Sequence, residues 1–129
     1  MPRYLITFDD GWMDHIPDAE MPTVSDDAHA VMREAIDAGV WIFSAGLESQ
    51  QASVVAGDGM VTDGPYPETK EVIGGFAVLD VPTREQGLEW AAKIAKACRC
   101  AQEVREIMYD PQQDAMLRTA DRPWLTPRP

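Results

Sequence analysis

Basic residues, cysteines and long apolar runs are all scarce in this chain of 129 residues, and each scarcity excludes a class of protein. Only 11 Lys and Arg stand against 22 Asp and Glu, and the formal net charge of -11 disfavours binding to nucleic-acid phosphates or anionic lipids. No apolar run approaches the roughly 20 residues that cross a bilayer, and the N-terminus has no signal-peptide layout. We therefore expect a cytoplasmic protein without nucleic-acid or membrane partners.

The two cysteines, Cys98 and Cys100, are too few for a structural metal site. Such a site takes about four ligands, and no further Cys or His stands nearby in the sequence. The chain also has no Gly-rich phosphate loop, no nucleophile elbow and no His cluster. We therefore predict no metal, no cofactor, and neither hydride nor phosphoryl transfer. Both thiols are expected to stay reduced and to pack at the end of a helix.

Apolar residues make up 45% of the chain, which is enough to form the core of one domain. Alternating or apolar runs predict strands over 3–8, 41–47, 76–81 and 103–108. Two short apolar runs, 54–56 and 60–62, flank a Gly-Asp-Gly turn and predict a hairpin. With the two helices described next, the order is β-α-β-(hairpin)-β-α-β, an α+β arrangement close to the split βαβ fold. We assign 1–110 to this domain and 111–129 to a polar, proline-punctuated tail.

Capping and periodicity locate the two helices. Ser25, Asp26 or Asp27 can cap the first, which Gly39 stops. Thr83 begins the second in a capping-box pattern that continues to about residue 97. The predicted buried stripe of the first helix comprises Ala28, Val31, Met32, Ala35 and Ile36. In the second helix, Leu88, Ala91, Ala92 and Ala95 are expected to face the sheet, and Trp90, Ile94 and Ala97 form a second apolar patch that needs a cover.

The strands are apolar on both faces, although two helices can cover only one face of a sheet. Along the strand at 76–81, Phe76 and Val78 alternate with Ala77 and Leu79. A second copy of the chain, packed sheet to sheet, would bury the uncovered face. The sequence therefore predicts a homodimer through the sheet face.

A charged loop at 63–71, Asp-Gly-Pro-Tyr-Pro-Glu-Thr-Lys-Glu, leads into Ile73-Gly74-Gly75-Phe76. Asp-Gly-Pro forces a tight turn, because Gly reaches backbone angles closed to other residues and Pro fixes its own φ. This stretch closely resembles the DGPF signature of the YCII-related family of small bacterial proteins. Tyr66 stands where Phe is usual, and Pro67 stands where a small residue is common. The resemblance implies a ferredoxin-like dimeric α/β barrel with an antiparallel sheet.

A second resemblance, to the YciI-like branch of the same family, rests on His29 followed by Ala45-Gly46 at the end of the next strand. It implies a His-Asp active-site pair, with His29 as the matching imidazole. Asp37 lies roughly 12 Å from His29 along the helix and cannot share a proton with it. Asp9 and Asp63 both remain as partners, and we favour Asp63 because its Gly-Pro neighbours would hold it rigidly.

Two functions are compatible with these features. The first is a small cofactorless enzyme acting on a small organic molecule held between sheet and helices, in which His29 moves protons, Asp63 orients it and Tyr66 lies at the rim. The alternative is a non-catalytic module that binds a ligand or a protein, since DGPF-type domains also occur alongside sigma factors of the extracytoplasmic-function group.

Four further residues are candidates for ligand binding. Glu68 and Lys70 either orient a polar ligand or form a solvated ion pair of little energetic value. Trp41 and Phe76 either line an apolar cavity or pack in the core, as strand aromatics commonly do.

Overall fold

The computed structural model describes residues 2–48, 52–65 and 72–119. Its strands are β1 (Arg3–Asp9), β2 (Trp41–Gly46), β3 (Ser53–Val55), β4 (Val61–Asp63), β5 (Ile73–Asp80) and β6 (Glu103–Glu106), and its helices are α1 (Met21–Asp37), α2 (Arg84–Cys98) and α3 (Pro111–Thr119), with a short 3-10 turn at Asp18–Glu20. Four strands form one antiparallel sheet in the order β2-β5-β1-β6, and β3 and β4 form a separate hairpin. The predicted α+β class and element order are confirmed, and the arrangement is consistent with a ferredoxin-like fold.

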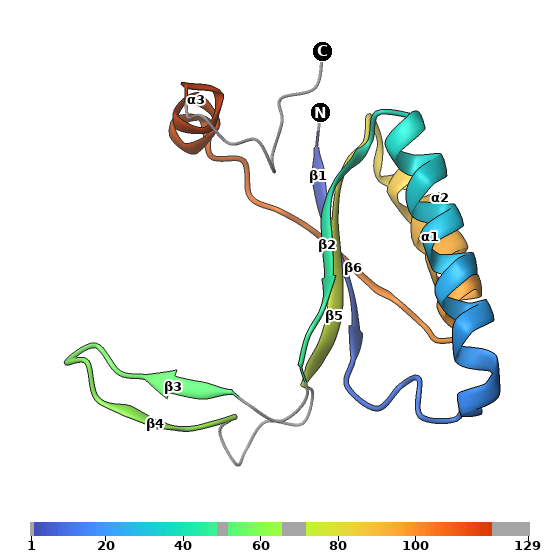
Figure 1. Cartoon of the computed structure of the whole chain (residues 1–129). Coiled ribbons are helices and arrows are strands. Elements are labelled where there is room, and N and C mark those ends of the chain that lie inside the picture. Colours follow the sequence, from blue (N-terminus) through green and yellow to red (C-terminus); the bar gives the residue numbers. More distant parts are fainter. Residues whose placement is uncertain (1, 49–51, 66–71, 120–129) are drawn as a thin grey trace.

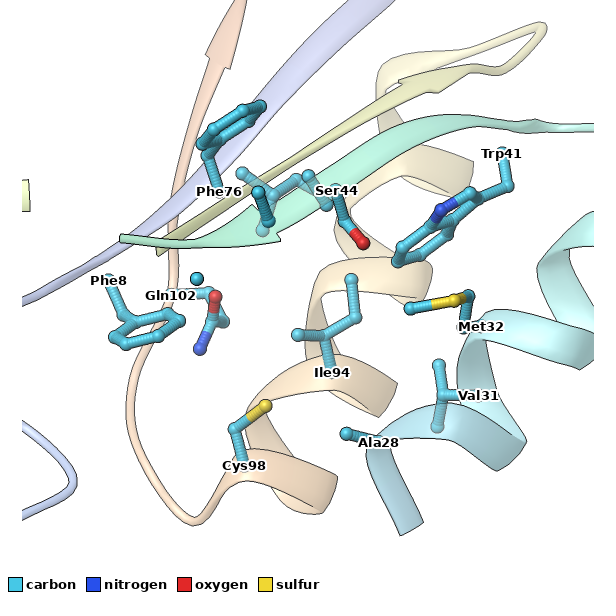
Figure 2. A pocket seen from close by; sticks show the side chains of 14 residues that line it. Phe8, Ala28, Val31, Met32, Trp41, Ser44, Phe76, Ile94, Cys98 and Gln102 are labelled. Carbon is cyan, nitrogen blue, oxygen red and sulfur yellow. The ribbon is translucent and has the colours of Figure 1, made fainter. Parts of the chain in front are cut away.

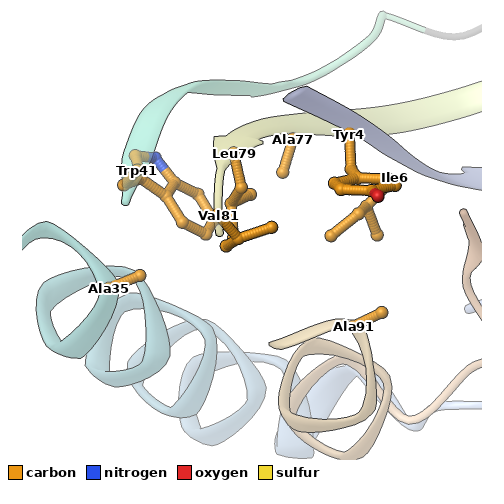
Figure 3. Close-up of a cluster of buried hydrophobic side chains, with 8 residues drawn as sticks. All are labelled: Tyr4, Ile6, Ala35, Trp41, Ala77, Leu79, Val81 and Ala91. Atoms are coloured by element: carbon orange, nitrogen blue, oxygen red, sulfur yellow. The ribbon is translucent and has the colours of Figure 1, made fainter. Parts of the chain in front are cut away.

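Helices α1 and α2 cover one face of the sheet, while the hairpin and α3 lie on the other side of it (Figure 1). The core fills the space between the sheet and the two helices (Figure 3). Leu79 stands at its centre, because Tyr4 of β1 and Trp41 of β2 are its register partners on either side. Leu79 has no exposed surface and Tyr4 is 1% exposed. The sheet and both helices therefore depend on this one row of side chains.

Helix α1 begins at Met21, four residues earlier than the earliest predicted cap. Ser25, Asp26 and Asp27 lie inside the helix, and Glu20 at the N-cap makes no side-chain cap hydrogen bond. Pro22 explains the early start, because its fixed φ suits a first helical turn that needs no N–H donor. Gly39 ends the helix with φ +77, as predicted.

In both helices, some residues that were predicted to be buried are exposed. The inward stripe of α1 includes Val24 and Ala35, and Ile36 is 54% exposed. In α2 the buried residues are Gly87, Ala91 and Ala97. Leu88 is 44% exposed, while Trp90 and Ile94, expected on a second patch, pack against the core. Gly87 explains the rotation of α2, since a Cβ there would lie 3.2 Å from the Tyr4 ring. Thr83 caps α2 as predicted, accepting a hydrogen bond from the backbone N–H of Gln86.

Strand β5 begins at Ile73, three residues before the predicted start, and includes both glycines. Gly75 pairs with Phe8 on one side and Gly46 on the other. A Cβ at Gly75 would lie 2.5 Å from the Phe8 ring, so the missing side chain lets that ring lie against β5. The two glycines therefore allow close packing at the start of the strand, ahead of the predicted range of 76–81.

The C-terminal part of the described chain contains a helix that the sequence did not predict. Strand β6 ends at Glu106, and α3 follows over Pro111–Thr119. Arg3 links α3 to the sheet, because its Nε lies 2.8 Å from Asp80 and its Nη1 lies 3.2 Å from Asp114. No helix among the described residues is both long enough and apolar enough to cross a bilayer.

The sheet face opposite α1 and α2 carries Leu5, Phe43, Phe76 and Val78, and we call it the open face. Leu5 pairs with Val78, and Val78 pairs with Phe43. The rings of Phe43 and Phe76 are 6.1 Å apart between centroids, and Phe43 is 43% exposed. Both faces of the sheet are thus apolar, as the alternation along β5 predicted.

Candidate functional site

A cavity of about 180 Å³ lies between the sheet and helices α1 and α2 (Figure 2). Its lining consists of Ile6, Phe8, Ala28, Val31, Met32, Trp41, Ser44, Ala45, Gly46, Phe76, Ala77, Ile94, Cys98 and Gln102. None of these residues carries a charged side chain. A mostly apolar concavity with a few polar groups is the usual form of a small-molecule site.

The cavity exists because short side chains stand at positions where larger ones would fill the space between the sheet and the helices. Ala28 on α1, Ser44 on β2 and Ala77 on β5 all border it with short side chains. Phe8 and Trp41 supply rings at its two ends (Figure 2). Trp41 borders the cavity and also belongs to the buried core, with 9% of its surface exposed.

Phe76 borders the cavity through its part of β5, but its ring lies on the far side of the strands from Ser44 and Ile94 (Figure 2). The ring instead stands beside Phe43 on the open face. Register explains this, because Phe76 alternates with Ala77, which faces the helices. Of the two aromatic candidates, Trp41 therefore presents its ring to the cavity and Phe76 presents its ring to the open face.

Three polar side chains reach the cavity: Ser44, Cys98 and Gln102. They come from β2, from the end of α2 and from the segment before β6 (Figure 2). The Gln102 amide nitrogen makes only long contacts, 3.4 Å to the Cys100 carbonyl oxygen and 3.5 Å to its sulfur. Contacts of that length are weak, so the amide can turn toward a ligand without losing a strong hydrogen bond.

Both cysteines are free and half-buried. Burial raises the pKa of the Cys98 thiol, although the neighbouring Arg99 lowers it in part. Burial, together with the proximity of Cys98, raises the pKa of Cys100 to about 11. Both groups are therefore protonated at neutral pH, which makes them neutral, weakly polar groups and poor nucleophiles.

These pKa shifts predict slow alkylation of the folded protein. In the wild type, where both thiols are present, iodoacetamide should modify Cys100 about 100-fold more slowly in the native than in the unfolded chain near pH 8, because the pKa rises from 9.0 to about 11. The unfolded thiol ionises first, so this group also contributes stability below about pH 9 that is lost as the pH rises toward about 11. Mass spectrometry of quenched reactions measures the rates, and equal native and unfolded rates would contradict the assignment.

His29 lies on the exposed side of α1, next to the cavity residue Ala28 but not in the cavity lining. Its Nδ1 is 2.7 Å from the Ser25 carbonyl oxygen and 3.3 Å from the Ser25 hydroxyl. A carbonyl oxygen only accepts hydrogen bonds, so Nδ1 donates its proton to the helix's own backbone. The imidazole is therefore engaged locally and faces solvent.

Asp63 ends β4 and is exposed. The hairpin that carries it lies on the opposite side of the sheet from α1 (Figure 1). Within the described ranges, His29 contacts Ser25, and neither of its two predicted partners, Asp63 or Asp9, contacts it. The other candidates of the signature loop, Tyr66, Glu68 and Lys70, lie outside the described residues.

Several cavity residues were missed by sequence reasoning. Phe8 was interpreted only as a residue of the first strand, Ile94 as part of the second apolar patch of its helix, and Cys98 as a residue at the end of a helix. Ser44 carried no usable signal, because strict alternation from Trp41 places it on the other face of the sheet. The register shift between Trp41 and Phe43 brings it beside Ala77, on the helix-covered face. Gln102 carried no signal either, since its role depends on where the chain turns after α2. Among residues 2–48, 52–65 and 72–119, no three His, Cys, Asp or Glu side chains lie close enough together to hold a metal ion.

Comparison with known proteins gives two matches. The family model of the YCII-related domain matches residues 17–109, from the turn before α1 to the segment after β6. A protein of Rhizobium meliloti (strain 1021), described as uncharacterized, is 33% identical over 75 residues, which cover 55% of this chain and 60% of that protein. The chain thus spans less than two thirds of the length of this relative. Because the family model matches well over half of the chain, the protein belongs to the YCII-related domain family.

Proposed function

We propose that this protein is a non-catalytic binding protein that holds a small organic molecule in the cavity between the sheet and helices α1 and α2. The observation that carries the proposal is the cavity itself: about 180 Å³, bordered by apolar residues and by no charged side chain. An apolar cavity of about 150 Å³ in another protein is large enough to bind benzene. The space here therefore suits a molecule of one or two rings.

Affinity can be bounded from ligand size. A ligand of about ten non-hydrogen atoms that gains about 0.5 kcal/mol per atom binds with about −5 kcal/mol. That corresponds to a dissociation constant on the order of 100 µM. The natural ligand, with more contacts, is expected to bind more tightly than such a probe.

Filling the cavity provides the test. Ala28→Phe should lower the affinity for 2-naphthol at least 10-fold, because Ala28 borders the cavity from α1. Ala30→Phe is the matched control, since Ala30 is exposed on the same helix and does not line the cavity. Titration followed by ligand fluorescence measures both, and equal affinity in the wild type and the Ala28 variant would refute the proposed location.

The local hydrogen bonds of His29 and the position of Asp63 across the sheet favour binding over catalysis by this pair. Proton transfer by His29 and Asp63 stays a prediction, and it would require a carboxylate to reach the exposed face of α1. A His29→Ala variant separates the two functions. Binding in the cavity predicts an unchanged dissociation constant, within about twofold, whereas an acid-base enzyme would lose turnover.

The proposal includes a homodimer through the open face. Leu5, Phe43, Phe76 and Val78 present an apolar surface that neither α1 nor α2 covers (Figure 1). An ion pair between Glu103 and Arg105, 2.6 Å apart, borders it on β6. An apolar centre with a charged rim is typical of an interface between copies. The hairpin and α3 lie on the same side of the sheet and would flank the second copy.

Sedimentation velocity at micromolar concentration tests the dimer. The wild type should sediment with twice the mass of one chain. Phe43→Arg should sediment as a monomer, because it places a charge within the apolar surface. Ile36→Arg is the matched control: Ile36 is also an exposed apolar residue, but it lies on α1, away from the open face. A monomeric wild type would exclude this part of the proposal.

A further inference from the structure

Resting on the proposed function, we infer that the cavity selects a neutral aromatic molecule of one or two fused rings with one hydrogen-bonding group, which Gln102 and Ser44 recognise. The inference adds a ligand class and two specificity-determining residues to a site that the preceding section defines only by size. Three observations support it: the absence of charge in the lining, the aromatic rings at the two ends of the cavity and the placement of its polar groups.

The absence of charged side chains in the cavity lining disfavours ionised ligands. Asp, Glu, Lys, Arg and His are all absent from the 14 lining residues, so an ionised ligand would lose its hydration without gaining a counterion. The thiol of Cys98 does not supply one, because burial keeps it protonated at neutral pH. The net charge of -11 further repels anions from the protein as a whole. A carboxylate or phosphate ester is therefore disfavoured at the cavity as well as on approach to it.

The two rings that border the cavity favour an aromatic ligand. The cavity lies between the sheet and the helices, with the Phe8 ring at one end and the Trp41 indole at the other (Figure 2). Aromatic rings pack favourably against one another in offset or edge-to-face arrangements. Val31, Met32 and Ile94 supply the apolar surface between the two rings. An aromatic ligand can therefore pack against both rings as well as this apolar surface.

Besides the Cys98 thiol, two uncharged polar side chains reach the cavity from different elements. The Gln102 side chain lies beside Phe8, and the Ser44 hydroxyl points toward the same space from β2 (Figure 2). Within the part of the chain that the structure describes, the Ser44 hydroxyl has no protein partner, and Gln102 donates only through the two long contacts to Cys100. Both groups donate and accept, so either can bind a ligand hydroxyl or carbonyl. A ligand with no polar group would leave them unused.

A matched set of ligands and variants tests the inference. Naphthalene, 2-naphthol and 2-naphthoate share one ring system and differ only in the polar group. We expect 2-naphthol to bind at least 10-fold more tightly than 2-naphthoate. Gln102→Leu or Ser44→Ala should lower the affinity for 2-naphthol about 5-fold and change the affinity for naphthalene less than twofold. The reason is that 2-naphthol can form the hydrogen bond and naphthalene cannot. Protein is titrated into a fixed, low ligand concentration, and ligand fluorescence is followed.

The outcomes separate this inference from the proposed function. If 2-naphthoate binds as tightly as 2-naphthol, or if neither variant changes the ratio of 2-naphthol to naphthalene affinity, the ligand class is wrong while the cavity remains a binding site. If none of the three ligands binds, the proposed function itself fails. Gln102→Met guards against misfolding of the leucine variant, since it keeps the length and shape of the side chain without a hydrogen-bonding amide. It should fold, and it should weaken 2-naphthol binding about as strongly as Gln102→Leu.

Discussion

Replacing Leu79 with alanine should lower the free energy of unfolding by about 4 kcal/mol, within the range of 2–5 kcal/mol for a buried leucine. Leu79 has no exposed surface and lies between Tyr4 and Trp41 in the middle of the sheet. Its removal leaves a void that β1 and β2 can close only by giving up their hydrogen-bonded register with β5. Urea denaturation at a fixed protein concentration measures the change.

Leu88→Ala is the matched control, because the same atoms are removed from a position that is 44% exposed. We expect a loss below about 1 kcal/mol, since Leu88 gives up little buried area. The pair also tests the rotation of α2, because the sequence placed Leu88 against the sheet. A loss at Leu88 as large as that at Leu79 would contradict the observed rotation.

Replacing Gly74 with alanine should cost about 3 kcal/mol, at the upper end of the range for overpacking. A Cβ at Gly74 would lie 2.9 Å from both the backbone N and the Cα of Asp10. These are backbone atoms and cannot rotate away. Relief would require β1 and β5 to separate where the Asp10 N–H donates to the Val72 carbonyl, at an N···O distance of 2.6 Å. Thermal unfolding should show the loss as a melting temperature lower by roughly 10 °C.

Gly46→Ala is the control in the same sheet, because a Cβ there meets no atom within 4 Å. Its stability should stay within about 0.5 kcal/mol of the wild type or rise slightly, since alanine restricts the unfolded chain. If both alanine variants melt at the wild-type temperature, the close approach of β5 to the end of β1 is not a structural requirement.

The sequence predicted much of the fold because its signals are local. Alternation located the strands of the main sheet, and the Gly-Asp-Gly turn located the hairpin. The errors arose where a distant contact outweighs a local one. The rotation of α2 depends on Gly87 lying under Tyr4, and α3 is linked to the sheet through Arg3. Neither contact can be deduced from the spacing of residues in one segment.

The candidate site was harder to predict than the fold. Trp41 was selected as a candidate because an aromatic residue on a strand commonly packs in the core or lines a cavity. Ser44 and Gln102 were missed because a cavity forms where side chains are too short to fill the space between the sheet and the helices. The small residues that leave this space, such as Ala28 and Ala77, resemble ordinary packing residues in a sequence. His29 was selected because of the family resemblance and the chemistry of its imidazole, and the structure places it outside the cavity lining.

The central claim, that a small neutral aromatic molecule binds between the sheet and the helices, is tested most directly by nuclear Overhauser effects between bound 2-naphthol and protein methyl groups. The account predicts contacts to Val31, Met32 and Ile94, all of which line the cavity, and their loss in Ala28→Phe but not in Ala30→Phe. Contacts instead to Leu5 and Val78 on the open face, or signals that persist unchanged in Ala28→Phe, would contradict it.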